Sequence, residues 1–357
     1  MSWRKLLDRL TLRAVRERLD RRKLQQEMDV HRLFLLTSHH EAASAGRNPD
    51  IEAITSAADD MAFEGMQTAV AHHLQQQIKH IARHLEDRLG FCVHKAPSAI
   101  DHAEAGDGLW ISGTAQPGAV VALYPGIVYT PEHYKHLPGY PKVDRDNDAL
   151  LARYDGSIIN ALPWARLHGD PQADLQLDDS ARNDSAASSM TAAESAIARS
   201  ALSRGPERAG ALPLWQTQLE MRHPLALAHV ANHPPPSMQP NVMVASFSLA
   251  QIPGEDPPWL RAYIPNVTFQ PPNIPADEPS MKQTSLFSFR APHQPADSAC
   301  PHLSVGDPQN EVVGIAFVAL REVANEELLL NYRLSPYVSR PSWYAPVDEE
   351  EEQRRWH

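Results

Sequence analysis

Tyr332 ends a short apolar segment near the end of the chain, LLLNY, where it directly follows Asn331. A phenol both donates and accepts hydrogen bonds, and a buried tyrosine hydroxyl needs a partner. The pattern leaves two interpretations open. The hydroxyl either binds a backbone carbonyl and has a structural role only, or it points into a site, where it could orient a reacting group.

Asn232 and His233 form a second candidate group, at the end of an apolar stretch and directly before three prolines, Pro234 to Pro236. Asparagine offers donors and an acceptor, and histidine offers one of each, which suits recognition of the edge of a heteroaromatic ring. The prolines fix the backbone, so a ligand would meet a preorganised loop. A lone pair of this kind can also simply cap a loop.

The third group is GDGLW, from Gly106 to Trp110. Two glycines one residue apart allow the backbone to approach a ligand, with amides available for a carboxylate or a phosphate. A β-turn also explains this pattern. A dinucleotide-binding fold would need a third glycine and an immediate helix, which the following LWISGTAQPG does not provide.

Short β-prone runs must position these groups. After Gly90 the segments LWIS, AVVALY and IVY are separated by AQPG and PG, which are typical of turns. Residues 312 to 320 are apolar on both faces, as in a central strand, and the ANEE turn that follows places Asn325 where a positive φ is often required. Tyr124, in ALYPG, is interpreted as a half-buried strand residue, with a site-facing role as the alternative.

Before Gly90 the pattern is helical. Residues 1 to 23 contain nine Lys or Arg against three acids, with apolar residues at helical spacing, and the apolar positions between Met61 and Leu89 advance by threes and fours. The acids in the first segment favour a helix that docks on the body over a mitochondrial presequence. His73, His80 and His84 share one helix side and could bind a metal, but no cysteine or carboxylate completes the set, so solvated histidines are favoured.

Composition excludes several classes of protein. The chain has 357 residues, 42% of them hydrophobic, and lacks an apolar run long enough to span a bilayer. Cys92 and Cys300 are too few for a disulfide framework or a four-thiolate zinc site. The net charge of -11 argues against direct nucleic-acid binding over the whole surface. Residues 170–210 and 271–308 are poor in large apolar groups, so flexible insertions are expected there.

Taken in order on this β-rich background, the three groups resemble the SET domain family of lysine methyltransferases. GDGLW is similar to the family's G-x-G start, Asn-His with the later Pro240-Asn241 is similar to its Asn-His loop, and NEELLLNY is similar to its terminal G-E-E-L-x-x-D-Y segment. The resemblance implies an α+β chain, with a helical region at 1–90, a β-rich SET domain with a pseudoknot at 91–335, and a tail at 336–357.

The resemblance also implies a site for S-adenosyl-L-methionine and no metal. Its cofactor-binding residues would be Gly106, Gly108, Leu109, Trp110, Asn232, His233 and Tyr332, with Tyr332 also the catalytic residue that lines the transfer channel. The family's Cys and Ser after Asn-His are replaced by prolines, and no cysteine cluster follows Tyr332. Tyr337, Trp343 and Tyr344 could close the channel as an aromatic lid instead.

The expected activity is therefore S-adenosylmethionine-dependent methylation of a lysine side chain on a protein, with a histone or another basic protein as a candidate partner and no membrane partner. A non-catalytic SET-fold protein-interaction module is the alternative. A helix-based metal or nucleic-acid binder is a third hypothesis. The expected location is intracellular, in the nucleus or cytoplasm, with the mitochondrion as an alternative.

Overall fold

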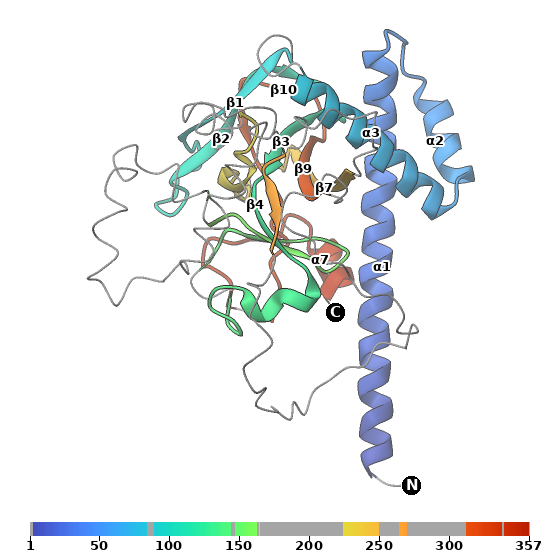
Figure 1. Cartoon of the computed structure of the whole chain (residues 1–357), viewed down its shortest axis with the longest axis vertical. Coiled ribbons are helices and arrows are strands. Elements are labelled where there is room, and N and C mark those ends of the chain that lie inside the picture. Colours follow the sequence, from blue (N-terminus) through green and yellow to red (C-terminus); the bar gives the residue numbers. More distant parts are fainter. Residues whose placement is uncertain are drawn as a thin grey trace, which may run out of the picture.

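The computed structural model describes residues 3–83, 89–143, 147–162, 164, 224–249, 264–269, 312–337 and 339–356. The expected insertions at 170–210 and 271–308 lie outside these residues, and so do His84 and Cys300. Within the described part, helices come first and strands follow (Figure 1).

Three helices open the chain: α1 (Trp3–Ser44), α2 (Ile51–Asp60) and α3 (Phe63–Arg83). Asp50 caps α2, because its side chain accepts a hydrogen bond from the backbone N–H of Ala53. The helix predicted between Met61 and Leu89 is confirmed over Phe63–Arg83 as α3, while residues 84–88 lie outside the described part. Gly90, which follows, has a positive φ of 75°. The basic segment 1–23 is part of α1, whose N-terminal part extends past the strands (Figure 1).

The strands form three small sheets, antiparallel except for the parallel pairing of β4 with β8. The first sheet contains β1 (Phe91–Pro97), β2 (Asp107–Ala115), β10 (Val323–Ala324) and β11 (Glu327–Leu328). The second contains β3 (Val120–Tyr124), β9 (Val312–Ala319) and β7 (Val242–Leu249). The third contains β5 (Leu150–Ala152), β6 (Ile158–Asn160), β4 (Gly126–Tyr129) and β8 (Asn266–Thr268).

Short helices complete the fold: the 3-10 helices η1 (Pro131–His136) and η5 (Ala228–Val230), and the C-terminal helix α7 (Glu349–Trp356). The predicted central strand is confirmed, since β9 lies between β3 and β7. The turn prediction is also confirmed, because Asn325 has a φ of 51°.

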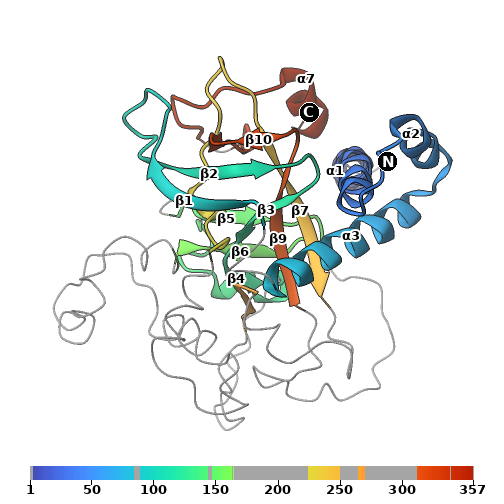
Figure 2. The ribbon, with the colours of Figure 1, turned by 90° about the horizontal axis from the view of Figure 1, so that it is seen from above.

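The helices and the strands share one hydrophobic core. Buried side chains of α1 and α3, such as Phe34 and Leu74, belong to the same cluster as Val121 and Phe317 in the second sheet. Gln77 of α3 joins the two parts by polar contacts, because its Nε2 donates to the carbonyl of Gly118 at 3.0 Å and its Oε1 accepts from another backbone N–H at 2.8 Å. Figure 2 shows all three helices on one side of the strands.

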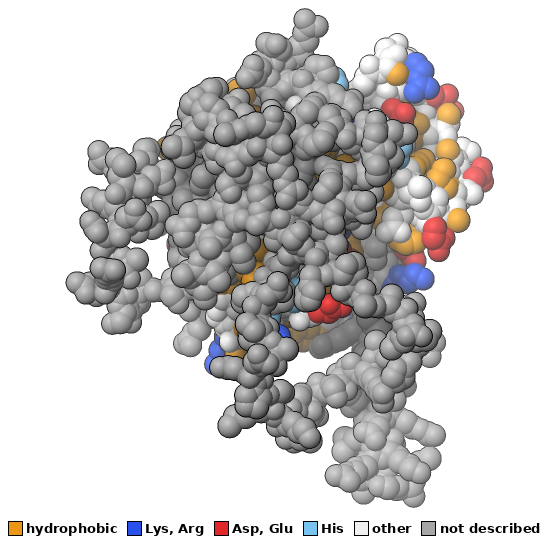
Figure 3. Space-filling view, in the orientation of Figure 1, with side chains coloured by type: hydrophobic (Ala, Val, Ile, Leu, Met, Phe, Trp, Pro, Cys, Tyr) orange, Lys and Arg blue, Asp and Glu red, His pale blue; other side chains and the backbone are white. Residues whose placement is uncertain are grey.

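The α+β class with an N-terminal helical region is thus confirmed, while the domain boundary at residue 90 stays a prediction. No helix in the described ranges combines the length and the apolar character that a bilayer crossing requires. Over α1, α2 and α3, the face in Figure 3 mixes apolar, acidic and basic side chains.

Candidate active site

Two of the three groups singled out in the sequence, the glycine turn and Asn232, meet at the carboxylate of Glu327, and the third, Tyr332, follows five residues later in the same segment. Strand β11 pairs with β2, which places Glu327 opposite Trp110 and Leu328 opposite Leu109. The Glu327 Oε1 accepts hydrogen bonds from Ser98 Oγ at 2.8 Å and from Asn232 Nδ2 at 3.2 Å. Its Oε2 accepts from the backbone N–H of Ala99 at 2.8 Å. One buried side chain therefore joins the β1–β2 connection, the Asn232 loop and the terminal segment.

Asn232 contacts the glycine turn as well as this carboxylate. Its Nδ2 also lies 3.1 Å from the carbonyl oxygen of Ala105 and 3.2 Å from that of Asp107, on the two sides of Gly106. Its own carbonyl accepts from the backbone N–H of Leu330 at 2.9 Å. The amide of Asn232 therefore holds the glycine turn and the terminal segment together.

Asn241 binds the other side of the terminal segment. Its Oδ1 accepts from the backbone N–H of Leu329 at 2.7 Å, and its Nδ2 donates to the carbonyl of Glu327 at 2.8 Å. Val242 forms an isolated parallel bridge with Leu330. Residues 327–330 are consequently hydrogen bonded to both ends of the 232–242 loop.

The glycine turn is shaped around this arrangement. Gly106 has a φ of 54° and open space where a Cβ would be, whereas a Cβ on Gly108 would lie 2.0 Å from Glu327 Oε1. The Leu109 side chain is fully buried, and the Trp110 indole donates to the carbonyl of Pro97 at 3.1 Å. Gly108 thus leaves room for an internal carboxylate, and Leu109 could touch a ligand only through its backbone.

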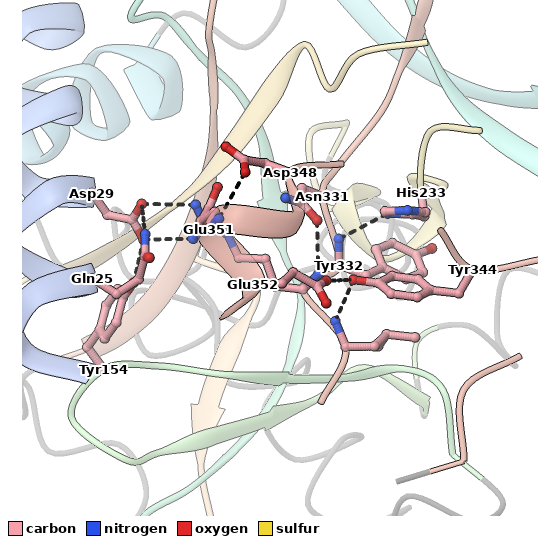
Figure 4. Close-up of polar contacts among 12 residues, drawn as sticks. Gln25, Asp29, Tyr154, His233, Asn331, Tyr332, Tyr344, Asp348, Glu351 and Glu352 are labelled. Carbon is pink, nitrogen blue, oxygen red and sulfur yellow. Dashed lines mark hydrogen bonds and ion pairs between the residues drawn. The ribbon is translucent and has the colours of Figure 1, made fainter. Parts of the chain in front are cut away.

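Tyr332 lies in an aromatic group with His233, Trp343 and Tyr344. The Tyr332 and His233 ring centroids are 5.5 Å apart, and Tyr344 stacks on His233 at 4.6 Å. Trp343 meets Tyr332 edge-on at 6.2 Å. Figure 4 shows His233, Tyr332 and Tyr344 side by side. Two of the three residues expected to form a lid are therefore at the site, whereas Tyr337 is 56% exposed and donates to the carbonyl of Trp356.

The polar atoms of His233 are engaged within the protein. Its Nδ1 accepts from the backbone N–H of Tyr332 at 3.3 Å, so Nε2 carries the proton and donates to the carbonyl of Ala345 at 2.7 Å. Burial lowers the pKa of His233, although its hydrogen bonds to the backbone oppose that shift. A neutral imidazole at physiological pH follows.

The Tyr332 hydroxyl donates to the backbone carbonyl of Ala231 at 2.8 Å, which is the first of the two interpretations given above. Burial, with smaller contributions from Asp148 and Glu327, raises the pKa of this phenol. Burial likewise raises the pKa of Tyr124, and the nearby Tyr332 adds to the increase. Tyr124 is buried rather than half-buried, and both phenols remain protonated donors at physiological pH.

A cavity of about 720 Å³ adjoins Tyr332. Its walls come from α1, α3, the β5–β6 hairpin, β7, the segment 330–335 and α7. The volume falls within the range of about 300–1,000 Å³ that is typical of ligand sites. Tyr332 therefore borders both the aromatic group and a space that can receive another molecule.

A charged network closes one side of this cavity. Arg333 forms two hydrogen bonds with the buried Asp29 of α1, at 2.7 and 3.0 Å, and its Nε lies 2.7 Å from Glu351 of α7 (Figure 4). Tyr154 of the β5–β6 hairpin also donates to Asp29. Burial alone would raise the pKa of Asp29, but the bonds and charge of Arg333 and the Tyr154 bond lower it overall. Burial and the Asp29 charge raise the pKa of Tyr154 to about 12.

Similarity to known proteins does not identify the function of this site. Comparisons with protein-family models, curated proteins and solved structures found no match. The function has to be inferred from the residues themselves.

The helix histidines form a separate group. His73 Nε2 lies 2.6 Å from a Glu41 oxygen, and its Nδ1 lies 3.1 Å from Thr37 Oγ1, so this imidazole joins α1 to α3. Across the described ranges, no group of three or more His, Cys, Asp or Glu side chains is arranged to hold a metal ion.

Sequence reasoning missed Glu327, Asp29 and Arg333 as parts of the site. Glu327 lay inside a quoted motif, but no signal separated it from the adjacent Glu326. The Asp29–Arg333 pair joins residues 304 positions apart, and nothing in either local sequence indicates the other.

Proposed function

We propose that this protein is an S-adenosylmethionine-dependent protein-lysine N-methyltransferase with a SET-type fold. The observation that carries the proposal is the convergence of the Gly106 turn and Asn232 on Glu327, together with the contact between His233 and Tyr332, whose ring centroids are 5.5 Å apart. The hydrogen bonds from Asn232 and Asn241 to opposite sides of residues 327–330 support a threaded terminal segment, as in the pseudoknot expected from the resemblance.

The residues fit the cofactor in part. The space beside Gly106 leaves its backbone accessible, and Trp343, whose ring centroid is 6.2 Å from that of His233, donates to Glu104, two residues before Gly106, at 2.6 Å. The Nδ2 of Asn232 and both ring nitrogens of His233 already have partners inside the protein. In this proposal the Gly106 backbone and the aromatic faces would hold the cofactor, while Asn232 and His233 keep that surface in shape.

Bound S-adenosylmethionine would supply an electrophilic methyl group. The protein must then provide a neutral amine, because only about one lysine in 2,500 is deprotonated at pH 7 when its pKa is near 10.4. The partly buried phenol of Tyr332 and the buried phenol of Tyr124 lie in surroundings that would disfavour an ammonium ion by desolvation. Tyr332 would orient the nitrogen lone pair towards the methyl carbon, and the amine proton would leave to water.

The cavity beside Tyr332 would admit the substrate from the side opposite the glycine turn. Tyr332 lines it together with the β5–β6 hairpin and residues 330–335, whereas Gly106 and Asn232 do not. Tyr332 would then stand between cofactor and substrate, as transfer between two separately bound molecules requires.

Two measurements test this function. S-adenosylmethionine or its demethylated product should raise the melting temperature, because each would bind only the folded state. Tritiated cofactor with a cell lysate should then label protein lysines. No stabilisation by either compound would overturn the proposal.

A Tyr332→Phe variant separates the chemistry from cofactor binding. It should keep the melting-temperature increase but lose roughly 100-fold in methyl transfer, as expected when a positioned hydroxyl is removed. Tyr140→Phe is the matched control, since that side chain is 56% exposed and belongs neither to the aromatic group nor to the cavity lining, and it should retain activity. Asn232→Ala should weaken cofactor binding first. Equal transfer by the Tyr332→Phe variant and wild type would leave Tyr332 as a structural residue.

The second candidate is a SET-type interaction module without catalysis. The internal partners of the Asn232 and His233 side chains favour it, because these groups are not free to bind a cofactor in this conformation. An unchanged melting temperature together with capture of a protein partner would support this alternative. A histone or another basic partner and the intracellular location both stay predictions.

A further inference from the structure

Two residues at the end of α7 present buried donors to the cavity beside Tyr332. The Nε and Nη1 atoms of Arg355 and the Nε1 atom of Trp356 are buried and have no hydrogen-bond partner in the described part of the chain. Both residues line the cavity, together with Tyr332. A buried donor without an acceptor costs free energy, and a charged one costs more than a neutral one.

The nearest carboxylates are already committed. Both oxygens of Asp29 accept two hydrogen bonds each, from Gln25, Arg333 and Tyr154. Glu351 pairs with Arg333 at 2.7 Å. Neither carboxylate is hydrogen bonded to Arg355 Nε or Nη1, and Glu351 Oε1 itself has no hydrogen-bond partner among the described residues. Both Arg355 atoms can therefore donate to a further acceptor in the cavity.

The other glutamates of α7 that have described partners also point away. Glu352 binds Arg340 at 2.6 Å and accepts a hydrogen bond from Tyr344, and Glu350 lies 3.7 Å from Arg354 on the exposed side of the helix. Three of the four α7 glutamates, Glu350, Glu351 and Glu352, are thus paired within the protein.

We infer that the cavity recognises an acidic side chain on the substrate, close in sequence to the target lysine, through Arg355 and Trp356. A carboxylate offers several acceptor positions and forms its strongest hydrogen bonds with guanidinium groups. This inference rests on the proposed function, because Tyr332 marks where the lysine would enter.

The size of the cavity limits the separation of the two side chains. A compact space of about 720 Å³ is about 9 Å across, which about three residues of extended chain span. The acidic residue should therefore lie within about three positions of the lysine.

The test uses the full chain and amidated peptides with a central lysine. In one set, a single Glu is placed at each position within three residues of the lysine, and in the matched set Gln takes its place. Fluorescence anisotropy, with and without the demethylated cofactor, should show about tenfold tighter binding for Glu at one or more positions. Equal binding of the two sets, or no binding by either, would overturn the inference.

A variant pair assigns the preference to its residue. Arg355→Gln should abolish the difference between Glu and Gln peptides, while Arg354→Gln, which removes the same charge from an exposed, paired arginine, should keep it. Circular dichroism and melting temperature show whether each variant folds. If Arg354→Gln loses the preference as fully as Arg355→Gln, the net charge of α7 and not the cavity explains it.

The outcomes separate this inference from the proposed function. Methyl transfer without a preference for acidic peptides would overturn the inference and leave the function intact. A preference for acidic peptides without cofactor binding would keep the recognition site and overturn the methyltransferase proposal.

Discussion

Glu327 shows how much of the candidate site depends on a single side chain. It is 4% exposed and accepts hydrogen bonds from Ser98, Ala99 and Asn232, whereas the adjacent Glu326 turns outward and pairs with Arg321 at 2.6 Å. Glu326 lies in the turn before β11, whereas Glu327 is the first residue of the strand, so two identical residues acquire different roles from their positions.

Gly108 gives a prediction at this scale. Replacing it with alanine would drive a Cβ to within 2.0 Å of Glu327 Oε1 and displace the carboxylate from its three donors. We expect the variant to lose about 2–4 kcal/mol in free energy of unfolding, measured by urea denaturation. Gly106→Ala is the matched control, since its Cβ meets open space and only the positive φ is unfavourable, at about 1–2 kcal/mol. A larger loss for Gly106→Ala would contradict the role given to Glu327.

The sequence predicted that Asn232, His233 and Tyr332 are neighbours only because their motifs occur in the same order as similar motifs of the SET family. Residue type identified them as candidate site residues, because each carries a polar group beside an apolar segment. It could not tell whether those polar groups face a ligand. In the structure Tyr332 donates to Ala231, and His233 is bonded at both nitrogens, contacts that depend on distant parts of the chain.

At the scale of elements, strong local patterns predicted β9, α3 and the Asn325 turn, because each signal lies within the element itself. The two-residue strands β10 and β11 and the parallel β4–β8 pairing were not predicted. Such short pairings follow from tertiary contacts, and their register has no local signature. The same holds for α1, whose predicted basic segment ends at residue 23 although the helix continues to Ser44 and carries Asp29.

The Asp29–Arg333 pair supplies the prediction for these elements, since it ties α1 to the segment after Tyr332. Asp29→Asn would leave the partly buried Arg333 guanidinium without its main counter-charge and should cost about 3 kcal/mol of unfolding free energy. Glu27→Gln, which affects only an exposed pair with Lys23, should cost less than about 0.5 kcal/mol.

The dependence on pH gives a second readout for this pair. The lowered pKa of Asp29 means that its stabilisation is present above the unfolded value of about 3.8 and is lost as the pH falls through the folded value. The stability difference between wild type and Asp29→Asn should therefore shrink below pH 4. A difference that stays constant from pH 7 to pH 3 would show that Asp29 acts through packing alone.

At the scale of the whole molecule, the common core makes the helices part of the environment of the site. α1 contributes Asp29 to the cavity and Phe34 to the core, and α3 contributes Val70 to both. A substitution in α1 or α3 that disturbs this packing should therefore alter the surroundings of Tyr332 through the shared cavity and core. The net charge of -11 did not reveal this, because a charge total does not show which carboxylates are used inside the fold.

Histidines distributed over the molecule lead to a prediction about the whole fold. His40, His73, His136 and His233 all have a pKa below the ordinary value, with burial as the largest cause in each case. Near pH 6 the unfolded chain therefore binds more protons than the folded one, so the free energy of unfolding should rise with pH up to about 6.5. Urea denaturation should show a loss of about 1–3 kcal/mol on going from pH 7 to pH 5.

His73→Gln tests whether the buried histidines cause that slope. His73 contacts Glu41 and Thr37 between α1 and α3, whereas its neighbour His72 is exposed. Because a glutamine does not titrate, the His73 variant should lose part of the dependence between pH 5 and pH 7, and His72→Gln should keep nearly all of it. Equal slopes in wild type and both variants would assign the acid sensitivity to other groups. A flat wild-type profile would mean that the imidazoles titrate alike in the folded and unfolded chains, in conflict with their burial.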